Sequence, residues 1–205
     1  MTAVKICGLT RPDDVALACA LGAAYVGFNF AESSPRRVSL ETARELADAT
    51  GPGVLKVGVF TEEKADAIAA AIAAGRLDLV QLHRRLTEEA VAASPVPVIA
   101  VARGSGGSLG VPRREILVRC HAVLFDPSEG TGTSLDPASI AEASWPVPVI
   151  VAGGLQPDNV RAAIRRLHPA AVDVASGVES APGVKDCDKL TRFFAAVREA
   201  DREPG

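Results

Sequence analysis

Residues 25–60 read YVGFNFAESSPRRVSLETARELADATGPGVLKVGVF, and this stretch decides the fold. Two short apolar runs, Tyr25–Phe30 and Leu55–Phe60, flank an amphipathic segment, Leu40–Gly51. Apolar residues on consecutive positions predict strands that are buried on both faces, which is typical of a parallel sheet. Acids in the first turn and a glycine after the last turn predict a helix between the two strands.

The same strand and helix unit recurs along the rest of the chain. The expected strands begin at Val4, Tyr25, Leu55, Leu79, Pro97, Ala122, Val147 and Ala171. The expected helices span residues 12–22, 40–51, 62–75, 87–94, 136–144, 156–167 and 188–200, and a short helix follows the Gly/Ser-rich loop that starts at residue 104. Eight such units favour a closed (β/α)8 TIM barrel over a doubly wound sheet, which more often has five or six strands.

Composition and charge limit the function classes. A chain of 205 residues with 48% hydrophobic and 23% charged residues is typical of one globular domain, which we expect to span residues 1–205. The net charge of −3 and the lack of a basic run argue against a nucleic-acid partner. No apolar stretch reaches about 18 residues, so we expect no membrane partner.

The cysteines and histidines indicate the compartment and argue against a metal. Four cysteines lie far apart in sequence without a C-x-x-C pair, and the three histidines do not cluster with them. Reduced thiols, together with the absence of a visible secretory signal, lead us to expect a cytoplasmic protein. A zinc site is not expected, because its ligands normally come in closely spaced pairs.

Small polar or titratable residues stand where nearly every apolar strand is expected to end. In a barrel of this class the active site lies at these carboxyl ends, so the pattern predicts an enzyme. The residues at these positions are Cys7, Gly8, Asn29, Gln81, His83, Arg103, Asp126, Gly153, Gly154, Ser176 and Gly177.

Cys7 and Asp126 are the candidates for proton transfer. A strand cysteine is often only a packed core thiol, and an aspartate after a strand is often only a loop cap. Together, however, a thiolate that accepts a proton and a carboxylic acid that donates one form a plausible acid–base pair. Lys5 lies two positions before Cys7 and therefore on the same face of the strand. We hypothesise that Lys5 lowers the pKa of the thiol.

Glycine-rich loops follow the seventh and eighth expected strands. They contain Gly153 and Gly154 in one loop and Ser176 and Gly177 in the other. A tight turn is the usual reason for a glycine pair, but in barrels these two loops often bind phosphate through backbone N–H groups. Arg36 and Arg37, in the loop after the second strand, are either surface charges or a bidentate site for a carboxylate.

Several motifs give the chain a resemblance to a known family. They are KICGLT (Lys5–Thr10), VGFNFAESSPRRVS (Val26–Ser39), VGVF (Val57–Phe60), VQLH (Val80–His83), LFD (Leu124–Asp126), GTG (Gly130–Gly132), AGGLQPDNV (Ala152–Val160) and VDVASGVESAPGVKD (Val172–Asp186). Because it carries these motifs in this order, the chain resembles phosphoribosylanthranilate isomerase, an enzyme of tryptophan biosynthesis. That family converts N-(5-phosphoribosyl)anthranilate to a carboxyphenylamino-deoxyribulose phosphate by an Amadori rearrangement.

The resemblance implies a role for each matching residue. Cys7 corresponds to the general base, Asp126 to the general acid, and Arg36 to the residue that binds the anthranilate carboxylate. The backbone of Gly153, Gly154, Ser176 and Gly177 corresponds to the phosphate site. The resemblance implies a small-molecule phosphoribosyl substrate, no cofactor and no metal, and either a monomer or a homodimer.

Three residues depart from the family pattern, and two other functions stay open. Arg84, Glu129 and Ala175 stand where glycine, glycine and serine are common, which leaves room for an altered substrate range. One alternative is an isomerase that acts on the related aminoimidazole substrate of histidine biosynthesis, although such enzymes typically use two aspartates. The other is a barrel that binds a phosphate ligand without catalysis.

Overall fold

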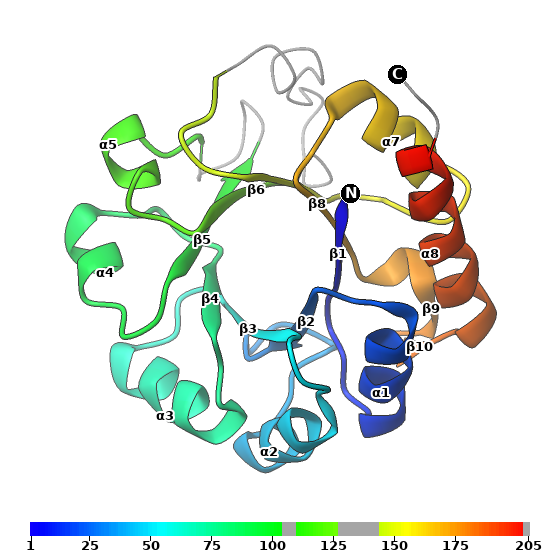
Figure 1. Ribbon diagram of the computed structural model, residues 1–205. Coiled ribbons are helices and arrows are strands. Elements are labelled where there is room, and N and C mark those ends of the chain that lie inside the picture. The colour runs from blue at the N-terminus through cyan, green and yellow to red at the C-terminus, as the bar shows by residue number, and fades with distance from the viewer. Residues whose placement is uncertain (104–109, 127–143, 203–205) are drawn as a thin grey trace.

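The chain forms a closed barrel of eight parallel strands surrounded by helices (Figure 1). The computed structural model describes residues 1–103, 110–126 and 144–202. The strands are β1 (Ala3–Ile6), β2 (Tyr25–Asn29), β3 (Leu55–Phe60), β4 (Leu79–Leu82), β5 (Val98–Arg103), β6 (Ala122–Asp126), β7 (Val149–Val151) and β8 (Ala171–Val174). The predicted (β/α)8 barrel is confirmed.

Helices cover the outside of the barrel. They are α1 (Pro12–Leu21), α2 (Leu40–Ala49), α3 (Ala65–Gly75), α4 (Glu88–Ala92), α5 (Arg114–Leu117), α7 (Val160–Leu167) and α8 (Cys187–Arg202). The α8 helix packs against α7 and α1 and so covers the seam where the barrel closes. Within the described part of the chain, no helix is both long and apolar enough to cross a membrane.

The seam itself joins the first strand to the last. The β1 strand pairs in parallel with β2 on one side and with β8 on the other. Lys5 lies directly opposite Asp173 in the β1–β8 register. The barrel therefore has no free edge, and residues from the two ends of the chain become neighbours.

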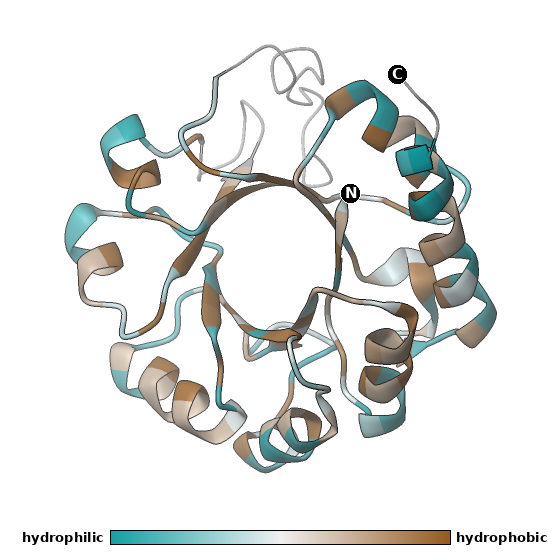
Figure 2. Ribbon diagram, in the orientation of Figure 1, coloured by the Kyte–Doolittle hydropathy of each residue, from teal (hydrophilic) through white to brown (hydrophobic). Residues whose placement is uncertain are grey.

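The interior changes from apolar to polar along the strands. Alternate residues of a strand share a face, so Ala3, Lys5 and Cys7 succeed one another toward the same end of β1. An apolar cluster, which includes Val57, Leu79, Ile99, Leu124 and Ile150, forms one layer of this interior. Figure 2 shows the hydrophobic strands of the barrel and the mixed hydropathy of the helices outside them. The polar side chains collect at the carboxyl ends.

Some boundaries differ from those that the sequence predicts. The seventh strand was expected to continue to Gly154, but β7 ends at Val151, since Gly153 and Gly154 adopt positive φ angles of 85° and 64°. The eighth was expected to continue to Gly177, but Ser176–Val178 form the 3-10 helix η1. The α7 helix starts at Val160, four residues after the expected start at Gln156.

One element was not expected, and some predictions are not tested. A short antiparallel hairpin, β9 (Glu179–Ala181) and β10 (Val184–Lys185), follows η1. The helix predicted over residues 136–144, the glycine-rich segments 104–109 and 130–132, and Glu129 lie outside the described residues.

Candidate active site

A cavity of about 390 Å³ lies at the carboxyl ends of the strands. Its volume is in the range of small-molecule sites. Among the described residues, those that line it lie in or after β1, β2, β3, β4, β6, β7 and β8 and include Cys7, Arg36, Gln81, Asp126 and Asp173. Because Cys7 and Asp126 face one cavity, a single ligand can reach both of them.

Cys7 stands directly after β1 and is partly buried. Its backbone N–H donates to the carbonyl of Val174 over 2.9 Å, which fixes the residue against the end of β8. A side-chain carbon at Gly27, on the neighbouring strand β2, would lie 3.0 Å from the Cys7 sulfur. The thiol thus occupies space that the glycine leaves open.

The environment raises the pKa of the Cys7 thiol above its ordinary value. Burial is the largest cause, because it disfavours the charged thiolate. The ammonium groups of Lys5 and Lys185 lower the pKa, and the Asp173 carboxylate raises it. Lys5 thus lowers the pKa of the thiol, as hypothesised, but burial outweighs the lysine and the net shift is upward.

Lys5 and Asp173 form a buried ion pair below the thiol. The Lys5 Nζ donates to Asp173 Oδ1 over 3.0 Å, and the two side chains are 0% and 8% exposed. Burial lowers the pKa of Lys5, but Asp173 and Cys7 together outweigh this effect, so the pKa lies above its ordinary value. Lys5 is therefore charged, and its charge lies next to Cys7.

Asp126 is the last residue of β6 and is partly exposed to the cavity. Its charge acts on Asp173, where burial and Asp126 both raise the carboxyl pKa. The cavity thus contains the Cys7 thiol and the carboxyl groups of Asp126 and Asp173. Asp173 raises the pKa of Cys7, and Asp126 raises the pKa of Asp173.

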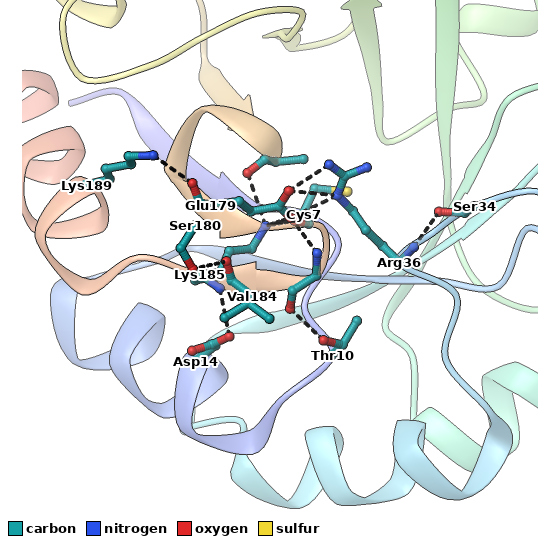
Figure 3. Close-up of polar contacts among 12 residues, drawn as sticks. Cys7, Thr10, Asp14, Ser34, Arg36, Glu179, Ser180, Val184, Lys185 and Lys189 are labelled. Carbon is teal, nitrogen blue, oxygen red and sulfur yellow. Dashed lines mark hydrogen bonds and ion pairs between the residues drawn. The ribbon is translucent and has the colours of Figure 1, made fainter.

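Arg36 also lines the cavity, and its guanidinium is held by Glu179 (Figure 3). The Arg36 Nε donates to both Glu179 carboxylate oxygens over 2.8 and 3.2 Å, and Nη2 donates to Oε2 over 2.7 Å. Burial raises the pKa of Glu179, but the hydrogen bonds from Arg36 and Lys185 lower it more, so it lies below its ordinary value. Of the two arginines left open by the sequence, only Arg36 lines this cavity.

The glycine loops border the same cavity. Gly153, Gly154 and Ser176 line it, whereas Gly177 does not. A side-chain carbon at Gly177 would overlap the carbonyl oxygen of Leu155, so this glycine packs the two loops against each other. The N–H of Gln156 is already bonded to Asn159 Oδ1 and is not available to a phosphate.

Gln81 carries a buried polar atom that has no partner among the residues that the structure describes. Its Nε2 lies 2.6 Å from His83 Nε2, while its Oε1 has no hydrogen-bond partner among the described residues. Gln81 is only 2% exposed and lines the cavity. A buried acceptor left unpaired is costly, so this oxygen is suited to accept a hydrogen bond from a ligand.

The sequence alone predicted no role for Asp173, Glu179 or Lys185. Asp173 interrupts the otherwise apolar strand AVDV, and this was the available signal. Glu179 and Lys185 belong to the motif VDVASGVESAPGVKD, but nothing in the local sequence links them to Arg36. They become neighbours only through the β9–β10 hairpin.

Two of the three departures from the family pattern, Arg84 and Ala175, lie among the described residues. Arg84 Nη1 donates to the carbonyl of Glu63 over 3.3 Å, and Arg84 is not among the cavity-lining residues. Ala175 lines the cavity, and its carbonyl accepts from Lys185 over 3.2 Å.

Comparison with known proteins identifies the relatives of this chain. Residues 4–196 match the sequence profile of the family described as N-(5'-phosphoribosyl)anthranilate (PRA) isomerase. A relative from Chlorobaculum parvum, named N-(5'-phosphoribosyl)anthranilate isomerase, is 40% identical over 98% of this chain and 97% of its own length.

Solved structures agree with this result. A crystal structure of phosphoribosyl anthranilate isomerase in complex with reduced 1-(o-carboxyphenylamino)-1-deoxyribulose 5-phosphate has a TM-score of 0.80 and 32% identity, covering 97% of this chain and all of that one. A structure of monomers generated from the dimeric enzyme of Thermotoga maritima has the same TM-score, identity and coverage.

Proposed function

The chain belongs to the N-(5'-phosphoribosyl)anthranilate isomerase family, and on that premise we propose that Cys7 and Asp126 carry out its proton transfers. Family membership makes it an isomerase of tryptophan biosynthesis. The observation that supports the proposed residues is that Cys7 and Asp126 line one cavity together with Arg36.

The proposed reaction begins at the ribose ring oxygen. Asp126, as general acid, donates a proton to this oxygen while the bond from C1 to the ring oxygen breaks, and C1 becomes doubly bonded to the anthranilate nitrogen. This positive Schiff base makes the hydrogen on C2 acidic. The thiolate of Cys7 removes that proton, and the electron pair moves toward the nitrogen to give an enolamine.

The enolamine then becomes the ketone product. C1 gains a proton and the C2 hydroxyl loses one, so that the product has the same composition as the substrate. No oxidant, reductant or co-reactant is consumed in this scheme. Removal of the C2 proton requires the thiolate form of Cys7, which the charges of Lys5 and Lys185 favour and burial disfavours.

We assign the rest of the substrate to the groups around this pair. Arg36 binds the anthranilate carboxylate through charge-assisted hydrogen bonds. The backbone of Gly153, Gly154, Ser176 and Gly177 binds the phosphate; for Gly177 this assignment rests on the family motif, since its own packing is against Leu155. The Gln81 Oε1 accepts a hydrogen bond from a ribose hydroxyl, which would give this buried atom its partner.

A fluorescence assay of phosphoribosylanthranilate consumption tests the function directly. We expect the purified protein to consume the substrate, and Cys7→Ala and Asp126→Asn to lower kcat by about 10²- to 10⁴-fold each while still binding ligand. Cys187→Ala is the matched control, because Cys187 is exposed on α8 and should leave kcat unchanged. Unaltered turnover in both site variants would contradict the proposed acid–base pair.

A further inference from the structure

In the described part of the chain, the contacts of the Arg36 guanidinium leave one of its edges to a ligand. Its Nε and Nη2 form three hydrogen bonds with the Glu179 carboxylate, so the Nε–Nη2 edge of the planar guanidinium is occupied. The edge formed by Nη1 and the second hydrogen of Nη2 lies outside these contacts. Arg36 lines the cavity and Glu179 does not, which places the carboxylate behind the guanidinium as seen from the cavity.

Glu179 is itself firmly held. Its Oε1 accepts from Lys185 Nζ over 2.8 Å and from the backbone N–H of Gly183 over 3.3 Å, in addition to the bonds from Arg36. Glu179 and Lys185 are both buried, at 7% and 6% exposed. A guanidinium bound to so constrained a carboxylate loses little further freedom when a ligand binds.

Lys185 connects the Arg36–Glu179 pair to the ends of β1 and β8 through hydrogen bonds. Its ammonium has three N–H donors, which go to the carbonyl of Cys7 over 2.7 Å, the carbonyl of Ala175 over 3.2 Å and the Glu179 carboxylate. The Lys185 backbone N–H also donates to Asp14 Oδ2 on α1 over 3.0 Å. Figure 3 shows the Glu179 carboxylate between Lys185 and the guanidinium of Arg36, with Cys7 beside them.

We propose that Glu179 is a positioning residue which presents the Nη1–Nη2 edge of Arg36 to the aryl carboxylate and thereby makes the site selective for carboxylated N-aryl phosphoribosylamines. This inference rests on the proposed binding of that carboxylate by Arg36. The planar fork of arginine binds a carboxylate well only when one edge faces it, so orientation of the guanidinium controls the gain in affinity.

Two stable ligands separate this role from a merely structural one. They are the reduced product analogue, 1-(o-carboxyphenylamino)-1-deoxyribitol 5-phosphate, and the same molecule without its carboxylate. Their dissociation constants are measured by titration calorimetry, which does not depend on turnover. We expect the wild-type protein to bind the carboxylated ligand more tightly, and Arg36→Met to remove most of this preference.

The decisive variant is Glu179→Gln. We expect it to weaken binding of the carboxylated ligand by about tenfold or more and binding of the other ligand by less than about twofold. Glu32→Gln is the matched control, because Glu32 forms an exposed pair with the neighbouring Arg37 at 4.0 Å. We expect this control to change neither dissociation constant.

Each other outcome has a defined meaning. Equal weakening of both ligands by Glu179→Gln, or no weakening of either, overturns the proposal while the role of Arg36 can still hold. If wild-type protein and Arg36→Met show the same preference for the carboxylated ligand, the proposed role of Arg36 fails, and this inference fails with it.

If Glu179→Gln does not fold because Lys185 is left unpaired, the double variant Glu179→Gln/Lys185→Met replaces it. Wild-type preference in the double variant contradicts the proposal.

Discussion

Two glycines make room for the side chains of Cys7 and Arg36. Gly27 on β2 lies against the sulfur and the Cα of Cys7, where a side-chain carbon would be 3.0 and 3.1 Å away. Gly8 has a φ of 69°, and a side-chain carbon there would overlap the Cδ of Arg36. Glycine adopts this left-handed conformation without strain. The Cys-Gly pair at the end of β1 therefore sets the positions of both the thiol and the arginine.

The charge on Cys7 should depend on pH in a specific direction. Because burial raises the pKa of this thiol, the fraction of thiolate increases only as the pH rises above the range of an ordinary cysteine. We expect both the rate of Cys7 alkylation by iodoacetamide and kcat/KM to rise with pH along the same curve. Alkylation of Cys7 is measured by mass spectrometry of the peptide that contains it.

A double variant checks the cause of this pH profile. Lys5 lowers the pKa of Cys7 more than Asp173 raises it, so Lys5→Met/Asp173→Asn should move the midpoint of alkylation to higher pH. Removal of both groups avoids a buried, unpaired Asp173. A midpoint that stays in place or moves to lower pH would show that the pair does not tune the thiol.

At the scale of elements, the strand ends and the loops after them have different tasks. Along β6 the inner face is apolar in its first part and becomes polar at its end, as Ala122, Leu124 and Asp126 show. The loops after β7 and β8 bring backbone groups to the same end. Packing between these two loops depends on Gly177, which lies against the carbonyl of Leu155.

Gly177→Ala should therefore disturb two loops at once. We expect the free energy of unfolding to fall by about 1–3 kcal/mol, the usual cost of overpacking, and KM for the phosphorylated substrate to rise. Urea unfolding and steady-state kinetics measure the two effects. Gly51→Ala is the control, since a side-chain carbon there would meet only Cys19 at an ordinary distance of 3.6 Å. Identical results for the two variants would contradict this role for Gly177.

For the whole molecule, the closure of the barrel depends on its first and last strands. The buried pair of Lys5 and Asp173 spans this seam, and α8 covers it from outside. The pair lies between the apolar interior and the cavity. The pair therefore affects both the stability of the closed barrel and the charge near Cys7.

Removal of one partner should destabilise the barrel strongly. We expect Lys5→Met to lower the free energy of unfolding by about 3–5 kcal/mol, because it leaves a buried carboxylate unpaired. The double variant Lys5→Met/Asp173→Asn should recover part of this loss. Urea unfolding is the measurement, and Lys56→Met is the control, since its pair with Asp78 is partly exposed and should contribute about 1 kcal/mol or less. A loss equal to that of the control would contradict a stabilising role for the seam pair.

The sequence by itself determined the barrel and the residues at its active end. Alternation of apolar runs with amphipathic segments is a local property, because the repeat of side-chain direction follows from backbone geometry. It located all eight strands, and it put Cys7 and Asp126 at strand ends where one cavity collects them.

Only the tertiary structure decided how the charges around this cavity are paired. Arg36 meets Glu179 across 143 positions of sequence, Lys5 meets Asp173 across 168, and Lys185 reaches the carbonyl of Cys7 across 178. Such contacts leave no periodic signal, since they exist only after the last strand has paired with the first. The β9–β10 hairpin then brings Glu179 and Lys185 to the end of β1, where burial and nearby charge set the pKa of the thiol.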